Sequence, residues 1–332
     1  MDLFCKIRGV KETRARFEWL YRANPAGEAR VWILQTSSGK PVGFTAGFPR
    51  EVWVCGERKR ALVCGDFSIE TAHRTLGPAV MLRRAVKVLI DGGEYALLYA
   101  HPSPRMLAVH GRVGHPQLSS MMRWVQPLRA RNTARARLGP LIGSLVTPAL
   151  NLMLTTRRWL QCASTSGLTV QETSSLTDEY DALDAVLGTV YPVIGCRGRA
   201  HLTWRFLECP KVQVTILEAR DGARQLVGYL VLQHDAELAA IHDLAYLPGS
   251  GADRALVATA VRRVSDTRAE NLIFVVPREY PGRPALRSAG FWERSPELPI
   301  VCYAGQDLPQ KAVIEAAESW YMTVGDRDVY PY

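Results

Sequence analysis

An internal repeat constrains this chain of 332 residues more than any other feature. The segment WLYRANP, which begins at Trp19, has the same Trp-to-Pro spacing as WRFLECP, which begins at Trp204. In each copy an alternating apolar run follows (31–34 and 214–217), then a glycine-containing turn, then VGF or VGY. Such β-branched and aromatic runs bounded by Gly and Asp are typical of β-hairpins, so each copy is predicted to begin with one.

The two copies share the same order of predicted elements after this hairpin. A strand carrying one aspartate is expected at 61–69 and again at 238–246, and a helix is expected next in each copy. A nearly all-apolar strand then ends at a proline, and a short helix after it ends at a glycine. Two copies of one α/β unit in a chain of this length predict two domains.

We expect residues 1–126 to form an N-terminal domain and residues 166–306 to form a C-terminal domain. Residues 127–165 would be a basic and apolar linker, and residues 307–332 a C-terminal helix and aromatic tail. The tail would either fold back over a cleft or cap a domain edge, and we expect it to cap an edge.

The linker combines a basic run at 129–137 with an apolar run at 138–154. This composition suits either a helix lying in a membrane interface or a connecting helix packed between the domains. Gly139, Pro140 and Pro148 weaken a long helix. We therefore expect the connecting helix and keep peripheral membrane contact as the alternative.

The composition is that of a soluble globular protein, with 47% hydrophobic and 22% charged residues. The seven cysteines are scattered without a CxxC pair, so we expect no metal site, no disulfide framework and a reducing cytoplasm. No secretory signal or spanning segment is predicted. The net charge of +9 suits an anionic cofactor, and nucleic-acid binding is not expected because no recognised nucleic-acid-binding signature is present.

The segment RTLGPA at 74–79 lies between the predicted strand at 61–69 and the helix after it. Gly77 permits close backbone approach, and a helix N-terminus directs free N–H groups into the loop. Arg74 adds a guanidinium at the loop mouth, and Pro78 lies in the first helical turn, where its missing N–H costs little. The segment therefore predicts a site for a pyrophosphate.

This segment resembles the acyl-CoA loop [Q/R]-x-x-G-x-[G/A] of the GNAT superfamily of N-acetyltransferases. The spacing from Asp66 to Arg74 is similar to the superfamily pattern D-[LF]-x-V-x-P-x-x-R, and HGRVGH at 110–115 stands where Y-x-K-x-G-F is often found. The resemblance implies an α/β (α+β) fold with two tandem GNAT-like domains, each a mixed, mostly antiparallel central sheet flanked by helices.

The same resemblance implies an acyl-CoA-dependent N-acyltransferase. Acetyl would pass from acetyl-CoA to an amine of a small molecule, amino sugar or peptide by direct attack. The implied cofactor-binding residues are Phe67, Ser68, Ile69, Arg74, Thr75, Leu76, Gly77, Pro78, Ala79 and His101.

For catalysis, Asp66 and Glu70 are the candidates to remove a proton from the ammonium, and His110 would replace the usual tyrosine general acid. Asp66 has a counterpart in Asp243, which indicates a structural role, whereas Glu70 has none. The second copy lacks the loop arginine and has Leu286 in place of His110, so it is predicted not to bind acyl-CoA productively.

Two other functions stay open: a non-catalytic binding protein with the GNAT fold, and an aminoacyl or peptidyl transferase that uses tRNA. The sequence identifies neither the acceptor nor the oligomeric state.

Overall fold

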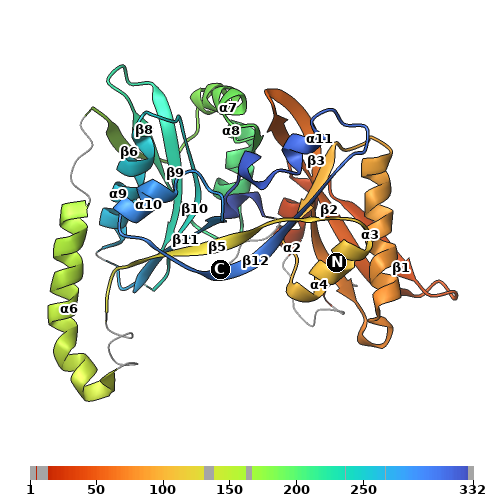
Figure 1. The fold of residues 1–332 in the computed structure, drawn as a ribbon, viewed down its shortest axis with the longest axis horizontal. Helices are drawn as coiled ribbons and strands as arrows, with labels where there is room; N and C mark the ends of the chain where they lie inside the picture. The colour runs from red at the N-terminus through yellow and green to blue at the C-terminus, as the bar shows by residue number, and fades with distance from the viewer. Residues whose placement is uncertain are drawn as a thin grey trace.

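The computed structural model describes residues 5, 14–130, 138–161, 167–235, 237–265 and 267–327. Most of the basic run, at 131–137, and the end of the tail, at 328–332, lie outside these residues. Within the described part, thirteen strands form one mixed sheet, with helices packed on it (Figure 1).

The repeat in the sequence is a repeat in the structure. The first half runs in the order β1 (Arg30–Gln35), β2 (Pro41–Val54), β3 (Glu57–Ile69), α3 (Leu76–Asp91), β4 (Leu97–Ala100), α4 (Pro104–Arg112) and β5 (Gln117–Pro127). The second half repeats this order with β8 (Thr215–Arg220), β9 (Leu226–His234), β10 (Ala239–Tyr246), α9 (Ala252–Val264), β11 (Asn271–Pro277), α10 (Arg283–Ser288) and β12 (Trp292–Ala304). The predicted order of hairpin, strand, helix, strand and short helix is confirmed in both halves.

The remaining elements precede, join or follow the two repeats. They are α2 (Arg14–Phe17), the π-helix η1 (Glu18–Arg22), η2 (Thr71–His73), α6 (Pro140–Gln161), β6 (Thr169–Thr173), α7 (Glu179–Val190), β7 (Val193–Gly195), α8 (Arg199–Leu202), the π-helix η3 (Thr203–Leu207), α11 (Lys311–Ile314), η4 (Ala317–Ser319), β13 (Trp320–Tyr321) and η5 (Val324–Asp326).

The two halves exchange their last strands. The strand order β2-β3-β4-β12-β5-β11-β10-β9 puts β12 beside β4 of the first half and β5 beside β11 of the second. β5 and β12 pair with each other antiparallel at the centre (Figure 1). The domain ranges 1–126 and 166–306 stay a prediction, and each half of the sheet is completed by a strand from the other range.

Two tryptophans mark the pseudo-two-fold relation between the halves. The Trp19 indole N–H donates to the carbonyl of Trp204 at 2.6 Å, and the Trp204 indole N–H donates to the carbonyl of Trp19 at 2.8 Å. Their rings stack with centroids 5.3 Å apart. Because these are the equivalent residues that reveal the repeat, the reciprocal contact joins the two halves at corresponding points.

The strand that leads into the loop at 74–79 is buried on both faces. In β3, Leu62 and Cys64 pack with Val86 and Ile90 of α3, whereas Val63 belongs to the core on the opposite face. Alternate side chains of a strand point to opposite faces, so a strand covered on both sides reads as a continuous apolar run. This packing fixes the start of α3 at the end of β3.

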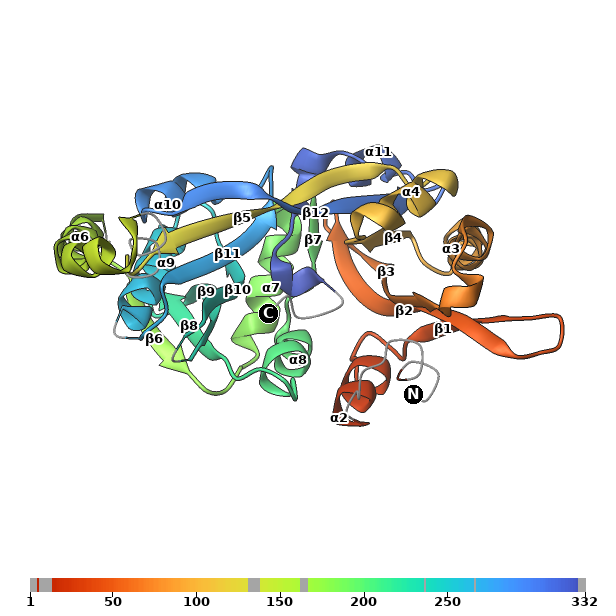
Figure 2. The same cartoon turned by 90° about the horizontal axis from the view of Figure 1, so that it is seen from below.

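The linker helix differs from the expectation. Residues 140–161 form one helix, α6, with Pro148 inside it. Figures 1 and 2 show α6 at one end of the molecule, beside the second half and not between the halves. Proline costs a helix one hydrogen bond, and helical neighbours on both sides retain theirs, so α6 continues through it. Among the described helices, none is long and apolar enough to cross a membrane.

Candidate active site

The first half contains a gap between two parallel strands. β3 and β4 pair from Ala61 and Leu97 to Cys64 and Ala100, and beyond these residues β3 no longer pairs with β4. In the described part of the chain, residues 65–69 pair only with β2. The strand edge that faced β4 is therefore left with backbone groups directed at the gap.

A bulge lies where β3 leaves β4. Ala46 pairs with Gly65 and Phe44 pairs with Ser68, so β3 carries one extra residue there. Asp66 lies in the bulge with φ of +40°, which is uncommon for a residue other than glycine. The Tyr21 hydroxyl donates to Asp66 Oδ2 at 2.8 Å, and Arg16 Nη2 lies 3.6 Å from the same oxygen. All three side chains are buried, so the structure joins Asp66 to the helical turn before β1.

The loop after β3 leads into α3 as predicted. Arg74 is exposed and donates from Nε and Nη2 to the carbonyl of Ile69 at 3.2 and 3.0 Å. Thr75 is the N-cap residue of α3, makes no side-chain cap, and is followed by no acidic residue in the first turn. The first-turn N–H groups of Leu76 and Gly77 have no acceptor within the helix.

This loop fits a phosphate group. A Cβ added to Gly77 would meet nothing within 4 Å, so the space over the helix start is open. Backbone N–H groups, the positive end of the helix dipole and a nearby guanidinium form a donor set suited to a pyrophosphate. The segment at 74–79 is thus a candidate site for an anionic group.

His101 lies at the end of β4, where the gap opens. Both of its ring nitrogens are buried, and neither has a hydrogen-bond partner among the described residues. Burial, with the charge of Arg327, lowers the pKa of His101 to about 3, so its imidazole is neutral at pH 7. A buried polar group without a protein partner is costly, which makes this imidazole a candidate contact for a ligand.

The other two predicted catalytic residues lie elsewhere around the strand end. Glu70 is partly buried, with its carboxylate 3.9 Å from Lys40 Nζ. His110 is 1% exposed, and its Nδ1 lies 3.0 Å from Nδ1 of His115. Burial, with Arg83 and His115, lowers the pKa of His110 to about 2. A neutral imidazole of this kind is a poor proton donor to a thiolate, so the role of His110 stays a prediction without support from the geometry.

The equivalent gap in the second half is filled by the C-terminal tail. β10 and β11 pair in parallel only as far as Ile241 and Phe274. Leu244, the counterpart of Phe67, accepts a hydrogen bond on its carbonyl from the hydroxyl of Tyr321. The Tyr280 hydroxyl lies 3.1 Å from that of Tyr321. The tail therefore occupies the strand edge that the first half leaves exposed.

The second loop also differs in its electrostatics. The Ser250 hydroxyl accepts from the N–H of Ala252 at 3.2 Å, although the N-cap residue of α9, Gly251, makes no side-chain cap. Gly251 has φ of +77°, and Asp253 stands in the first turn. A helix start with one first-turn N–H already bonded and a carboxylate beside it is less suited to an anion.

Buried ion pairs hold the tail in place. Asp326 receives hydrogen bonds from Arg50 of β2 at 2.9 Å and from Arg197 of the second half. Burial alone would raise the pKa of Asp326, but the two guanidinium groups outweigh it and lower this pKa. Thr323 donates to Asp243, the counterpart of Asp66, at 2.7 Å. Asp243 thus has a structural partner set, and β13 pairs with β7 at the sheet edge, as expected for a tail that caps an edge.

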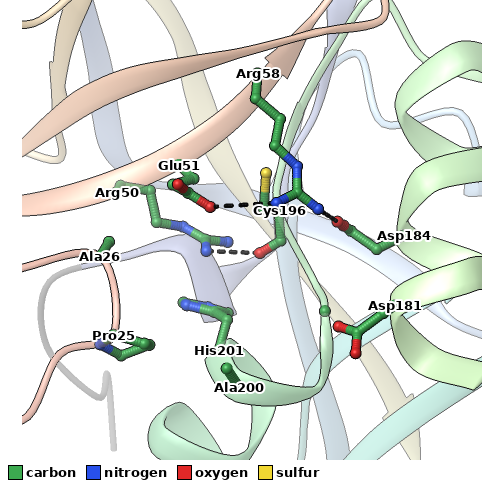
Figure 3. A pocket seen from close by; sticks show the side chains of 11 residues that line it. Pro25, Ala26, Arg50, Glu51, Arg58, Asp181, Asp184, Cys196, Ala200 and His201 are labelled. Carbon is green, nitrogen blue, oxygen red and sulfur yellow. Dashed lines mark hydrogen bonds and ion pairs between the residues drawn. The ribbon is translucent and has the colours of Figure 1, made fainter. Parts of the chain in front are cut away.

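A separate pocket of about 150 Å³ lies between the halves (Figure 3). It is lined by charged groups that include Arg50, Arg58 and Asp184. Arg50 lies opposite Ala61 in the β2–β3 pair, four residues of β3 before Gly65, where the β3–β4 gap begins. At about 3.3 Å per residue this is about 13 Å along the strand.

Three residues of these sites were not predicted from the sequence. Tyr21 reaches Asp66 from a π-helix, and its counterpart Phe206 lacks the hydroxyl, which was a visible difference between the copies. Arg83 stands on the buried face of α3, and its guanidinium lies 5.0 Å from the ring centroid of Phe67. Arg83 follows Ala79 by four residues, a spacing that puts both residues on the same face of a helix, and this was the sequence signal for its position. Tyr321 carried no local signal for its contact with the second half.

Comparison with known proteins gives the fold. No protein-family model matches the chain, and none of the curated proteins searched matches it. A conserved protein from Enterococcus faecalis with the description "Probable N-Acyltransferase" superimposes with a TM-score of 0.65 and 12% identity, over 93% of this chain and 70% of that one. A GCN5-related N-acetyltransferase from Anabaena variabilis gives 0.63 and 12%, over 91% and 69%. A tandem GNAT protein from the clavulanic acid biosynthesis pathway gives 0.55 and 13%, over 91% and 93%.

The chain therefore has the GNAT fold, which confirms the predicted fold class. The solved structures that resemble it include a tandem GNAT protein that covers nearly the same length. Identities of 12–13% establish the fold alone, and they leave the reaction and the acceptor to be argued from the site.

Proposed function

We propose that the protein is an acetyl-CoA-dependent N-acyltransferase whose working site lies in the first half. The observation that carries the proposal is the start of α3, which is uncapped, free of acidic residues and located at the end of the β3–β4 gap. The matching helix start in the second half has the N–H of Ala252 bonded to Ser250 and Asp253 in its first turn, and it stands beside a gap that Tyr321 fills. One of two equivalent positions is thus suited to the cofactor.

The chain would hold the cofactor mainly through its backbone. The N–H groups of Leu76 and Gly77 would receive the phosphates, and Arg74 would leave the carbonyl of Ile69 to join them. The edge of β3 at 67–69, which does not pair with β4, would pair with the pantetheine arm. Acetyl-CoA bound there supplies a thioester carbonyl to an amine, and the chain supplies position and proton transfer.

Asp66 and Tyr21 are the residues we propose for proton removal from the ammonium. Their 2.8 Å hydrogen bond lies at the bulge that opens the gap, and Arg16 Nη2 lies 3.6 Å from the same carboxylate oxygen of Asp66. Glu70 remains the alternative acceptor of that proton. His101, neutral and without a partner among the described groups, would orient either the thioester or the amine.

The proposal is tested by calorimetric titration with acetyl-CoA and by thiol release with a panel of amines. We expect one acetyl-CoA per chain. Arg74→Glu removes a charge-assisted hydrogen bond worth about 1.5–3 kcal/mol, so it should raise Kd at least about tenfold. Gly77→Glu should raise Kd as well, because its negative side chain enters the open space where the negative phosphates would bind.

Matched variants separate this effect from general damage. Gly222 also has nothing within 4 Å of an added Cβ, so Gly222→Glu makes the same change at a distant turn. Arg254→Glu alters the charge beside the second helix start. Both controls should keep the affinity of the unmodified protein. Absence of acetyl-CoA binding would refute the proposal, and loss of binding in Arg254→Glu alone would move the site to the second half.

A further inference from the structure

The outward face of α6 is a continuous apolar surface. Leu141, Leu145 and Leu152 are 81%, 80% and 69% exposed and recur at the spacing of one helix face. Together with their exposed neighbours they form what we call the α6 stripe. The α6 stripe consists of Leu138, Leu141, Ile142, Leu145, Leu152 and Met153.

The opposite face of α6 is less exposed. Val146, Leu150 and Asn151 are partly buried, and Asn151 Oδ1 accepts from the N–H of Ala130 at 2.8 Å. This bond ties the helix to the end of β5 with the stripe turned away. A contiguous exposed apolar surface is uncommon on a soluble monomer and indicates a partner or a membrane.

The charge of the surrounding sequence identifies the partner. From residue 95 to residue 171 the chain contains no aspartate or glutamate. It contains the arginines Arg105, Arg112, Arg123, Arg129, Arg131, Arg135, Arg137, Arg157 and Arg158. Four of these precede α6 within eleven residues of its start, and Arg157 and Arg158 lie in its last turns. The apolar stripe is thus bracketed by positive charge at both ends.

This bracketing disfavours a second copy as the partner. Two α6 helices packed along their stripes would bring arginines of both chains together, and the segment has no carboxylate to offset them. Nucleic acid would be attracted by the arginines but gains nothing from exposed leucines. An anionic lipid surface satisfies both features, since it accepts apolar side chains below its headgroups and arginines among them.

We propose that α6 lies in the surface of an anionic membrane, with the stripe inserted and the positive charge of the flanking sequence attracting the lipid phosphates. α6 is at one end of the molecule, whereas α3 and the loop at 74–79 are toward the other end (Figures 1 and 2). The membrane would therefore leave the proposed cofactor loop in water. This inference does not depend on the acyltransferase proposal, and the two fail in separate assays.

The test is co-sedimentation of the full chain with vesicles of phosphatidylcholine, with or without phosphatidylserine. We expect binding to the phosphatidylserine vesicles and little to the neutral ones. Leu145→Gln with Leu152→Gln should lower vesicle affinity at least about tenfold, and Arg157→Gln with Arg158→Gln should lower it as well. The control is Ile33→Gln with Val88→Gln, which removes comparably exposed apolar groups, 56% and 62% exposed, at the other end of the molecule.

Several results would overturn the inference. The inference would be wrong if the protein did not bind phosphatidylserine vesicles or bound neutral vesicles equally well. It would also be wrong if the control pair lowered vesicle affinity as much as the stripe variant does. Sedimentation velocity without lipid tests the second copy directly. A dimer that Leu145→Gln with Leu152→Gln abolishes would assign the stripe to self-association. In every variant named, acetyl-CoA affinity should equal that of the unmodified protein.

Discussion

Mild acid should destabilise this protein strongly because three of its histidines are buried in the neutral form. His110, His115 and His242 are each 1% exposed. Burial is the main cause that lowers their pKa values, to about 2, 3 and 3, and nearby cations add to it. In the unfolded chain the same imidazoles titrate near pH 6.5.

The linkage between proton binding and folding fixes the direction in which stability changes with pH. A folded pKa below the unfolded one means that the unfolded chain binds protons first, so stability is complete above about pH 6.5 and falls below it. Well below about pH 6.5 each such histidine removes about 1.4 kcal/mol per pH unit, and less near pH 6.5 itself. From about pH 7 to about pH 5.5 each loses about 1.2 kcal/mol, so these three together lose about 3.5 kcal/mol, and His101 and His201, whose pKa values burial also lowers, add to the loss. The total free energy of unfolding of a native protein is only about 5–15 kcal/mol.

Denaturant unfolding at the two pH values measures this loss, since carboxylates stay ionised over the interval. His242→Gln should reduce the loss by about 1.2 kcal/mol, because one titrating group is gone. An unfolding free energy equal at both pH values would refute the reasoning and would return His110 to candidacy as a protonated general acid.

Two substitutions test the buried polar groups. Asp326→Asn leaves Arg50 and Arg197 without their shared carboxylate, and equilibrium unfolding should show a loss of about 3–5 kcal/mol; a loss below about 1 kcal/mol would contradict a buried ion network. Because its pKa is lowered, the contribution of Asp326 in the unmodified protein holds above about pH 4 and is lost in stronger acid. Tyr21→Phe should lower kcat at least about tenfold with little change in the Kd of acetyl-CoA, and an unchanged kcat in steady-state assays would remove Tyr21 from proton transfer.

Local patterns in the sequence were sufficient for the loop at 74–79 and for the order of elements around it. Strand periodicity, a glycine with open space beside it and a helix start are properties of neighbouring residues, so they are legible without the fold. The site residues Tyr21 and Arg83 were not found, because their contacts depend on elements that the sequence places apart. Asp66 was found, but its partners were not.

What the sequence by itself determined was the duplication and the GNAT-like order of each copy, together with the prediction of an anion-binding loop at 74–79. Only the tertiary structure decided that β5 and β12 change places, that Tyr321 fills the second gap and that α6 turns an apolar face outward. Periodicity specifies that a strand is buried on both faces but not which strand lies beside it. That choice depends on contacts between residues far apart in the chain, such as Trp19 with Trp204 and Arg50 with Asp326, which form only when both halves are folded together.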